Sequence, residues 1–294
     1  MKIKDSISRK LFIWINNFLL LMLALVCIMP MIHIFAVSLS SRAAAAAGFV
    51  KFLPVDFTLI SYEYVLNRAA FWLSFVRTLH RVAIGVPINL FMTVMVAYPL
   101  SKEKEKFHAR TVYVWISFFT ALFSGGFIPS YILIKDLGLI DSIWALVLPG
   151  AVPVFNVILM LNFFRSTVPG ELEDAALIDG AGHFRTLFSI YIPCALPSIA
   201  TITLFSIVGH WNSYFDGMIY SKFVTSYPLQ TYLRTMVIAR DFSADTEDLR
   251  LISLISERTM KAAQIFIGAL PILAVYPFLQ KFFIKGIVIG SVKG

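Results

Sequence analysis

Long apolar stretches alternate with short polar segments through most of the chain. A helix needs about 20 residues to cross the roughly 30 Å hydrocarbon layer of a bilayer. Six stretches reach about that length, and they cover residues 11–38, 82–100, 111–134, 142–164, 195–220 and 262–284. The pattern predicts an all-α, polytopic membrane protein with six transmembrane helices.

Proline residues interrupt several of these stretches. They lie at Pro129, at Pro149 and Pro153, and at Pro271 and Pro277. Broken backbone is tolerated inside a bilayer where neighbouring helices or a polar cavity satisfy the freed peptide groups. The breaks therefore suggest a bundle around a pathway, although proline kinks in purely structural helices would give the same pattern.

The composition supports insertion into a membrane. Of the 294 residues 59% are hydrophobic and only 14% are charged, and the mean hydropathy is +0.80. A soluble domain of this length would need far more polar surface. The net charge of +8 does not point to nucleic acid, because cationic residues collect at the membrane ends of transmembrane helices. The first stretch exceeds the roughly 7–15 apolar residues of a cleaved signal, which predicts an uncleaved first span.

Basic residues give the expected orientation. They crowd two short segments, one before the first span and one after the second: Lys2, Lys4, Arg9, Lys10, Lys102, Lys104, Lys106 and Arg110. The positive-inside rule places both segments in the cytoplasm. With six spans, both termini then lie in the cytoplasm, as does segment 171–182, whereas segments 39–70 and 221–261 lie outside.

Segment 171–182, ELEDAALIDGAG, is an acidic island between two apolar stretches. Each of its four carboxylates would cost about 2.5–3.5 kcal/mol at the centre of a bilayer, so the island lies outside the membrane. Its first residues favour a helix, and Gly180 and Gly182 end that helix before a second amphipathic stretch runs to Pro193. The order helix, glycine turn, helix indicates a protruding docking element, and a solvated loop between spans is the alternative.

The residue order around the island resembles the EAA motif of ATP-binding-cassette importer permeases. That motif has an acidic residue, two alanines, three residues, a glycine, nine residues and then Ile-x-Leu-Pro. The matching residues are Asp174, Ala175, Ala176, Asp179, Gly180, Ile190 and Pro193. Asp174 replaces the usual glutamate and Ile192 replaces leucine. Because aspartate is shorter, either neighbouring Glu173 compensates for its reach or the coupling contact is altered.

Three further segments resemble the carbohydrate permeases that handle complex oligosaccharides: residues 97–102, 226–233 and 276–294. The resemblance implies an N-terminal span with an extracytoplasmic loop (1–70) and a core of five spans (71–284) that includes the EAA loop (165–197). It also implies a cytoplasmic tail (285–294) that reaches the ATPase dimer.

The resemblance also implies a set of partners and a place in the cell. These are a second homologous permease, two ATPase subunits, an extracytoplasmic solute-binding protein, membrane lipid and an oligosaccharide substrate, in the plasma (inner) membrane of a bacterium. ATP and Mg would be bound by the ATPase subunits, with no cofactor on this chain, and the acidic island would be the coupling helix. The chain has no Gly-x4-Gly-Lys-Ser/Thr phosphate loop, which agrees with a permease that is not itself an enzyme.

Two rival functions are a six-span secondary transporter and a membrane enzyme. These need buried ion-coupling acids or an embedded catalytic cluster. The six stretches contain one acid, Asp216. No metal-ligand spacing and no catalytic Ser/His/Asp set stands out, so no catalytic or metal residues are predicted.

Candidate substrate residues lie near the end of the fifth stretch and before the second. They are Trp211, Asn212, Tyr214, Phe215 and Asp216, and Arg77 and Arg81. On a continuous helix Trp211, Tyr214 and Phe215 would share one face, where their rings could stack on sugars. Aromatic residues at an outer membrane interface are the alternative. The two arginines could guide an anionic sugar such as a uronate oligomer, or could extend toward lipid phosphates.

Overall fold

The computed structural model describes residues 6–238 and 256–291, with side chains described as far as residue 277. Lys2 and Lys4, residues 239–255 of the predicted outer segment and the last three residues of the predicted tail lie outside the described residues. The chain divides into two compact units. Unit 1 contains residues 1–69 and 235–269, and unit 2 contains residues 70–234 and 270–294. No strand occurs within 6–238 or 256–291.

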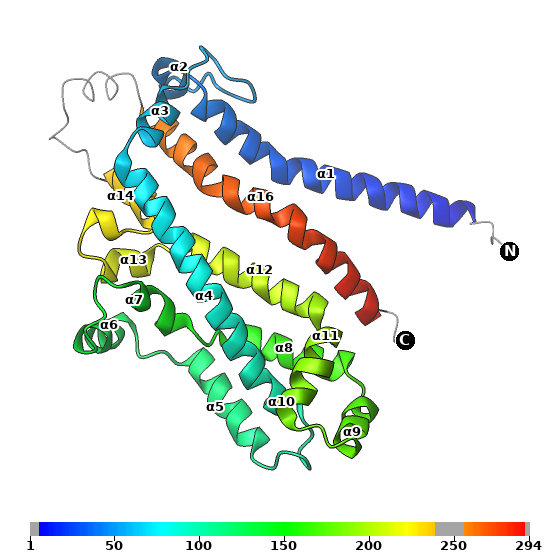
Figure 1. Ribbon diagram of the computed structural model, residues 1–294. Coiled ribbons are helices and arrows are strands. Elements are labelled where there is room, and N and C mark those ends of the chain that lie inside the picture. Colours follow the sequence, from blue (N-terminus) through cyan, green and yellow to red (C-terminus); the bar gives the residue numbers. More distant parts are fainter. Residues whose placement is uncertain (1–5, 239–255, 292–294) are drawn as a thin grey trace. The chain divides into compact units, whose positions relative to one another are not determined.

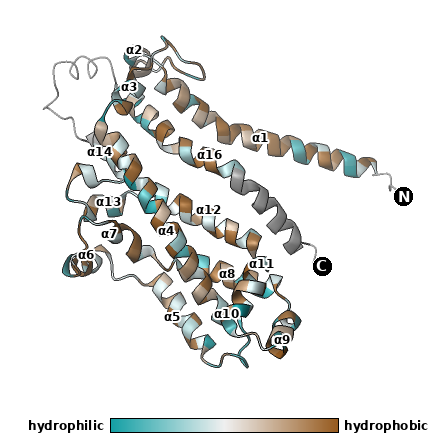
Figure 2. Cartoon of the chain, in the orientation of Figure 1, coloured by the Kyte–Doolittle hydropathy of each residue, from teal (hydrophilic) through white to brown (hydrophobic). Residues whose placement is uncertain are grey.

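Unit 1 contains α1 (Ile7–Ser38), α2 (Arg42–Ala46), α3 (Ile60–Leu66) and the beginning of α16 (Glu257–Ser291). The hydroxyl of Ser6 caps α1 by accepting a hydrogen bond from the Arg9 amide. Most of α1 is exposed in this single chain, and Figure 2 shows hydrophobic residues along its length. Its last turn packs with α2 and with Ala262 of α16 in a small apolar cluster.

Unit 2 is built around α4 (Ala69–Ser101). The other helices of this unit are α5 (Arg110–Leu122), α6 (Phe127–Asp136), α7 (Ile143–Val147), η1 (Leu148–Gly150), α8 (Val154–Thr167), α9 (Gly170–Ile178), α10 (His183–Thr186), η2 (Leu187–Tyr191), α11 (Ile192–Cys194), α12 (Leu196–Asn212), α13 (Phe215–Tyr220), η3 (Val224–Ser226) and most of α14 (Leu229–Ile238). The core of the unit joins α4, α8, η2 and α12 through side chains such as Ala97, Met160, Leu187 and Ile202. Figure 1 shows α9 and α10 near the end of α4, and α13 and α14 near its beginning.

The predicted six-span, all-α architecture is confirmed. Among the described residues three helices are individually long and apolar enough to cross a membrane: α1, α4 and residues 257–277 of α16. Three bent pairs pass the same test together: α5 with α6, the α7–η1 segment with α8, and the α10–α11 segment with α12. Counting each bent pair as one span gives six.

Several predicted boundaries differ from the structure. The second helix begins at Ala69 rather than at residue 82, so Arg77 and Arg81 lie inside it. The third span bends by 105° between α5 and α6, where Gly126 has φ of 83°, and not at Pro129. Pro129 lies in the first turn of α6, where a missing amide hydrogen does no harm. The break at Pro149 and Pro153 occurs as predicted, with a 48° bend.

The units divide the chain differently from the sequence-based scheme. Residues 235–269 belong with the N-terminal unit, although the sequence assigned them to the core. Helix α16 continues through Ser291, so residues 285–291 of the predicted tail are helical.

Candidate functional site

Helix α9 and the turn after it have the predicted order of helix, glycine turn and helix. Glu171 and Glu173 lie in the first turn of α9, where the helix dipole favours negative charge. Gly180 has φ of 74°, a conformation that glycine adopts without strain. The amide of Ala181 donates to the carbonyl of Ala176 over 2.9 Å, which closes the end of the helix before α10 begins at His183.

The two adjacent acids of the motif region have opposite environments. Glu173 is 6% exposed, and it accepts a 2.7 Å hydrogen bond from the hydroxyl of Tyr191. One of its oxygens lies 3.0 Å from Nζ of Lys102, which is also buried. The side chain of Asp174 is 61% exposed and contacts Lys106 over 2.7 Å at the surface. The structure therefore places Glu173 inward and Asp174 outward.

Aromatic rings surround the Lys102 ammonium. Its Nζ atom lies 3.9 Å from the ring centroid of Tyr98 and 4.1 Å from that of Tyr191. Such faces attract a cation, particularly when it is removed from water. The ring of Tyr191 thus contacts Lys102 and its hydroxyl donates to Glu173. Tyr191 thereby binds both members of the ion pair.

Burial and neighbouring charges shift the pKa values of both Glu173 and Lys102. Burial alone would raise the pKa of Glu173, but hydrogen bonds from Tyr191 and Lys102 and the charges of Lys102 and Lys106 hold it below its ordinary value. Burial lowers the pKa of Lys102, an effect that Glu173 opposes. The 3.0 Å separation between Nζ of Lys102 and the carboxylate oxygen of Glu173 is that of an ion pair.

The end of α4 that carries Lys102 is held by cations from two other helices. Arg165 of α8 donates to the carbonyls of Ser101 and Lys102 over 3.0 and 3.3 Å. Arg110 of α5 donates to the carbonyl of Leu100 over 2.8 Å. The last carbonyls of a helix lack partners within it and carry partial negative charge, so these contacts stabilise the end of α4.

Cavities flank the Lys102–Glu173 pair. One of about 510 Å³ is lined by side chains that include Met95, Phe107 and Leu177. Another of about 410 Å³ is lined by side chains that include Arg165 and Asp174. Both cavities are also lined by Lys102 and Glu173, so the pair lies between them.

Helices α9 and α10 expose apolar side chains, although neither belongs to the long apolar helices. Ile178, at the end of α9, is 87% exposed, and Phe184 of α10 is also exposed. Among the motif residues Ala176 is buried, whereas Ala175, Asp179, Gly180 and Pro193 are exposed and Ile190 is half-buried. Exposed apolar side chains beside exposed acids are typical of a surface that binds another protein.

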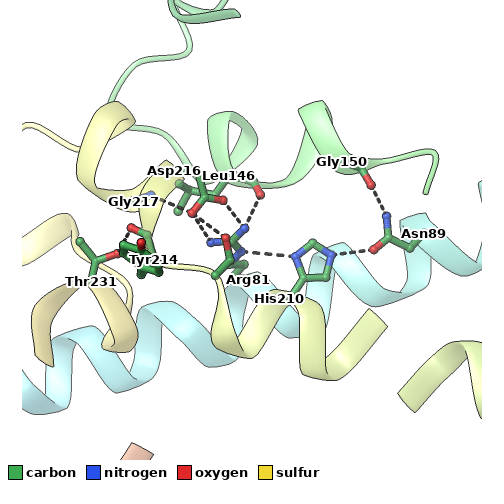
Figure 3. Close-up of polar contacts among 10 residues, drawn as sticks. Arg81, Asn89, Leu146, Gly150, His210, Tyr214, Asp216, Gly217 and Thr231 are labelled. Atoms are coloured by element: carbon green, nitrogen blue, oxygen red, sulfur yellow. Dashed lines mark hydrogen bonds and ion pairs between the residues drawn. The ribbon is translucent and has the colours of Figure 1, made fainter. Parts of the chain in front are cut away.

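A second polar cluster lies near the other end of α4, and Figure 3 shows its members. Arg81 of α4 is only 3% exposed and forms a bidentate ion pair with Asp216 of α13. Its guanidinium also donates to the carbonyl of Leu146 over 3.1 Å and to Nδ1 of His210 over 3.3 Å. Asp216 additionally accepts from the hydroxyl of Ser213 and the amide of Gly217.

The cluster continues through His210 of α12 to Asn89 of α4. Nδ1 of His210 must accept the Nε–H of Arg81, which assigns the ring proton to Nε2. Nε2 then donates to Oδ1 of Asn89 over 2.7 Å. The side-chain amide nitrogen of Asn89 donates to the carbonyls of Gly150 and Ala151 over 2.7 and 3.1 Å.

These contacts explain how the broken fourth span is stabilised. The break between α7 and α8 leaves carbonyls without partners from a continuous helix, which is costly away from water. Arg81 satisfies the carbonyl of Leu146, and Asn89 satisfies those of Gly150 and Ala151. The ring of His210 lies directly against Gly85, where a Cβ atom would collide with it. The cluster therefore joins α4, the broken span, α12 and α13.

The predicted substrate residues do not form one surface. The interpretation that Trp211, Tyr214 and Phe215 share a helical face is wrong, because α12 ends at Asn212 and Ser213 is extended. Trp211 is buried against Phe75, with ring centroids 6.0 Å apart, whereas Phe215 is 48% exposed. Asn212 is exposed, Tyr214 is half-buried, and Arg77 is half-buried.

Sequence reasoning missed several residues of these clusters, including Asn89, His210 and Tyr191. Each is separated from its partners by many residues, and no periodicity connects them. For Asn89 and His210 the available signal was a polar side chain inside an apolar stretch, whereas Tyr191 lies outside the six stretches. The described residues contain no group of three or more His, Cys, Asp or Glu side chains placed to bind a metal.

Comparison with known proteins identifies relatives that span nearly the whole chain. YtcP of Bacillus subtilis (strain 168), a polygalacturonan/rhamnogalacturonan transport system permease protein, is 38% identical over 94% of this chain and 96% of its own length. The protein LplC of the same organism is 41% identical over 92% of this chain and 90% of its own length. MelC, a melibiose/raffinose/stachyose import permease protein of that organism, is 29% identical over 82% of this chain and 83% of its length.

The fold is also similar to solved structures. A chain of a bacterial ABC transporter involved in the import of the acidic polysaccharide alginate aligns over 96% of this chain and 100% of its own. The TM-score is 0.80 and the sequence identity is 36%. No protein-family model matches the chain. The length and identity of these similarities show that the chain belongs to the permease subunits of ATP-binding-cassette sugar transporters.

Proposed function

We propose that this permease imports acidic oligosaccharides that contain uronate residues. The proposal rests on one observation: a relative named for polygalacturonan and a structural neighbour that takes part in alginate import both align over more than nine-tenths of this chain. Both of those polysaccharides are acidic. A substrate of the same charge class is therefore the proposal that these similarities favour most.

In this proposal helix α9 is the coupling helix and docks into an ATPase subunit on the cytoplasmic side. Three features support that role: α9 is excluded from the bilayer by its acids, it exposes Ile178 and Asp174, and it is anchored to α4 through Glu173. A force on α9 would be transmitted to α4 through the Lys102–Glu173 pair. Both termini then lie in the cytoplasm, and residues 285–294 extend toward the ATPase subunits.

The proposed transporter contains this chain, a second homologous permease, two ATPase subunits and an extracytoplasmic solute-binding protein in a bacterial plasma membrane. ATP and Mg would be held by the ATPase subunits, which supply the energy. A solved alginate transporter in complex with a pentasaccharide-bound periplasmic protein, 14% identical to this chain with a TM-score of 0.53, shares the fold.

The exposed residues Asn212 and Phe215 and the half-buried Tyr214 are proposed to line the substrate pathway, since their side chains reach the surface of unit 2. Trp211, Arg81 and Asp216 are proposed to support that surface from behind, because Trp211 and Arg81 are buried and Asp216 is bound by Arg81. Arg77 lies half-buried on α4 and is the remaining candidate for contact with an anionic sugar.

The test is ATP hydrolysis by the complete transporter in proteoliposomes. Binding protein loaded with trigalacturonate is expected to stimulate hydrolysis, whereas binding protein presented with maltotriose is not. Stimulation by maltotriose alone would contradict the proposed substrate class. In the same assay Asp174→Lys is expected to leave the protein folded, because Asp174 is exposed, and to uncouple hydrolysis from transport. Normal coupling in that variant would contradict the proposed role of α9.

A further inference from the structure

Arg234 of α14 lies over the ring of Tyr214. The guanidinium carbon is 3.6 Å from the ring centroid, which is close stacking. The side chain of Arg234 is exposed, and no carboxylate among the described residues lies within ion-pair distance of it. Within the described part of the chain Arg234 therefore presents a positive charge without a carboxylate partner, beside an aromatic surface.

Both members of this pair are held in place by neighbouring contacts. The hydroxyl of Thr231 donates to the carbonyl of Tyr214 over 2.7 Å (Figure 3), which fixes α14 to the segment before α13. The amide of Leu229 donates to the buried hydroxyl of Thr78 over 2.7 Å, which fixes the start of α14 to α4. Gly217 lies so close to Thr231 that a Cβ atom would collide with its hydroxyl. The backbone that carries the stacked pair is thus held by hydrogen bonds to α4 and between α14 and Tyr214.

Arg81 and Arg234 have different capacities for binding an anion. Arg81 is buried, and its guanidinium is already bound by Asp216, Leu146 and His210. Arg234 is exposed, and stacking leaves the edge of its planar guanidinium free to donate two parallel hydrogen bonds to a carboxylate. Of these two arginines, Arg234, which the sequence did not single out, is therefore the one available to an anionic ligand.

Aromatic surface continues next to the stacked pair. The rings of Tyr214 and Phe215 are 6.4 Å apart, and Phe215 meets Phe127 of α6 edge to face at the same distance. Phe127 and Phe215 are both exposed. The C–H face of a pyranose ring packs well on such rings, and a uronate adds a carboxylate at the edge of the same ring. The arrangement offers an aromatic platform for the sugar and a fixed cation for its charge.

We propose that Arg234, stacked on Tyr214, binds the carboxylate of a uronate residue in the transported oligosaccharide. The inference rests on the substrate class proposed above and names the side chain that selects for charge. An anionic lipid headgroup could offer similar charge, but it would not use the aromatic platform. The experiment below separates the two sources.

The test uses the complete transporter without its binding protein, in nanodiscs of phosphatidylcholine, which has no net charge. Calorimetric titration with trigalacturonate and with its methyl ester compares two ligands that share their rings and differ in charge. The wild type is expected to bind the acid at least about 10-fold more tightly, and Arg234→Gln is expected to remove this preference. Arg234→Lys keeps the charge but loses the planar stacking, so an intermediate preference is expected.

Lys135→Gln is the matched control, because Lys135 is an exposed cation in the last turn of α6 and lies outside the stacked pair. It is expected to keep the preference for the acid. A preference retained in Arg234→Gln would overturn the assignment of Arg234 and leave the proposed substrate class intact. A wild type without any preference would contradict the substrate class itself. Loss of the preference in nanodiscs of phosphatidylglycerol would show that the arginine holds lipid, which also overturns the assignment.

Discussion

Nζ of Lys102 lies 3.0 Å from a carboxylate oxygen of Glu173, and both side chains are buried. The pair joins the residue that directly follows α4 to the first turn of α9. Asp174, which follows Glu173 in the sequence and matches the acidic position of the EAA motif, is exposed. The residue that attaches α9 to the core is therefore not the residue that the motif singles out.

Replacing Glu173 is expected to have a larger effect on stability than replacing Asp174. Glu173→Gln leaves the buried Lys102 ammonium without its counter-charge, and breaking a buried pair in this way costs about 3–5 kcal/mol. Asp174→Asn removes an exposed contact worth about 0–1 kcal/mol. Thermal unfolding of the purified permease in detergent measures the difference, and equal stability of the two variants would contradict the anchoring role of Glu173.

A double variant provides the control for that prediction. Glu173→Gln combined with Lys102→Met removes both charges, and replacing a buried pair by neutral residues is often close to neutral in stability. The double variant should therefore be more stable than Glu173→Gln alone. A further loss of stability would mean that the effect of Glu173 is not exerted through Lys102.

The contribution of Glu173 should depend on pH in a defined direction. Its pKa is lowered in the folded state, so its stabilising contribution is fully present above its ordinary value of 4.5 and is lost as the pH falls through the lower folded value. The stability difference between the wild type and Glu173→Gln should be constant between about pH 6 and pH 8 and should shrink in acid. A difference that grew as the pH fell would be inconsistent with a lowered pKa.

Gly85→Ala is expected to destabilise unit 2. A Cβ atom at this position would collide with the ring of His210, which is held on one side by Arg81 and on the other by Asn89. Overpacking of this kind costs about 1–3 kcal/mol. Gly209→Ala is the matched control, since a Cβ atom on Gly209 would meet no other part of the chain within 4 Å. Alanine should be neutral or slightly stabilising there, because it favours a helix more than glycine does. Unfolding temperatures of the two variants test the prediction directly.

Exchanging the charges of Arg81 and Asp216 should not restore the cluster. Asp216→Asn alone is expected to destabilise the fold by roughly 3–5 kcal/mol, because Arg81 is buried. The exchange Arg81→Asp with Asp216→Arg keeps two opposite charges but loses the hydrogen bonds from Arg81 to Leu146 and His210. If the exchanged protein were as stable as the wild type, the contacts to Leu146 and His210 would have no structural role.

Trp211→Ala is expected to reduce stability as well as transport. Trp211 is 4% exposed and packs against Phe75, so its removal leaves a cavity that costs about 3–5 kcal/mol. Trp211→Phe retains most of the apolar volume and should recover much of the stability. A Trp211→Ala variant with unchanged unfolding temperature and poor uptake would instead support direct contact with sugar.

The sequence alone was sufficient for the class of protein and for the order of helix, glycine turn and helix around residues 171–182. Six apolar stretches predict six spans because crossing a bilayer requires a minimum length of apolar helix. The cost of burying carboxylates places residues 171–182 outside the bilayer, and the glycines end the helix where the structure has Gly180 at positive φ. These properties depend on local composition and on the solvent around each segment, so they can be recognised without knowledge of contacts.

Only the tertiary structure decided which polar residues pair with each other. Glu173 and Asp174 are adjacent and chemically alike, yet one points to Lys102 and the other to the surface. Arg81 and Arg234 are the same residue type, yet one is neutralised by Asp216 and the other is exposed on Tyr214. The physical reason is that pairing energies depend on distance and burial, which are set by where α4, α9, α13 and α14 meet and not by spacing along the chain.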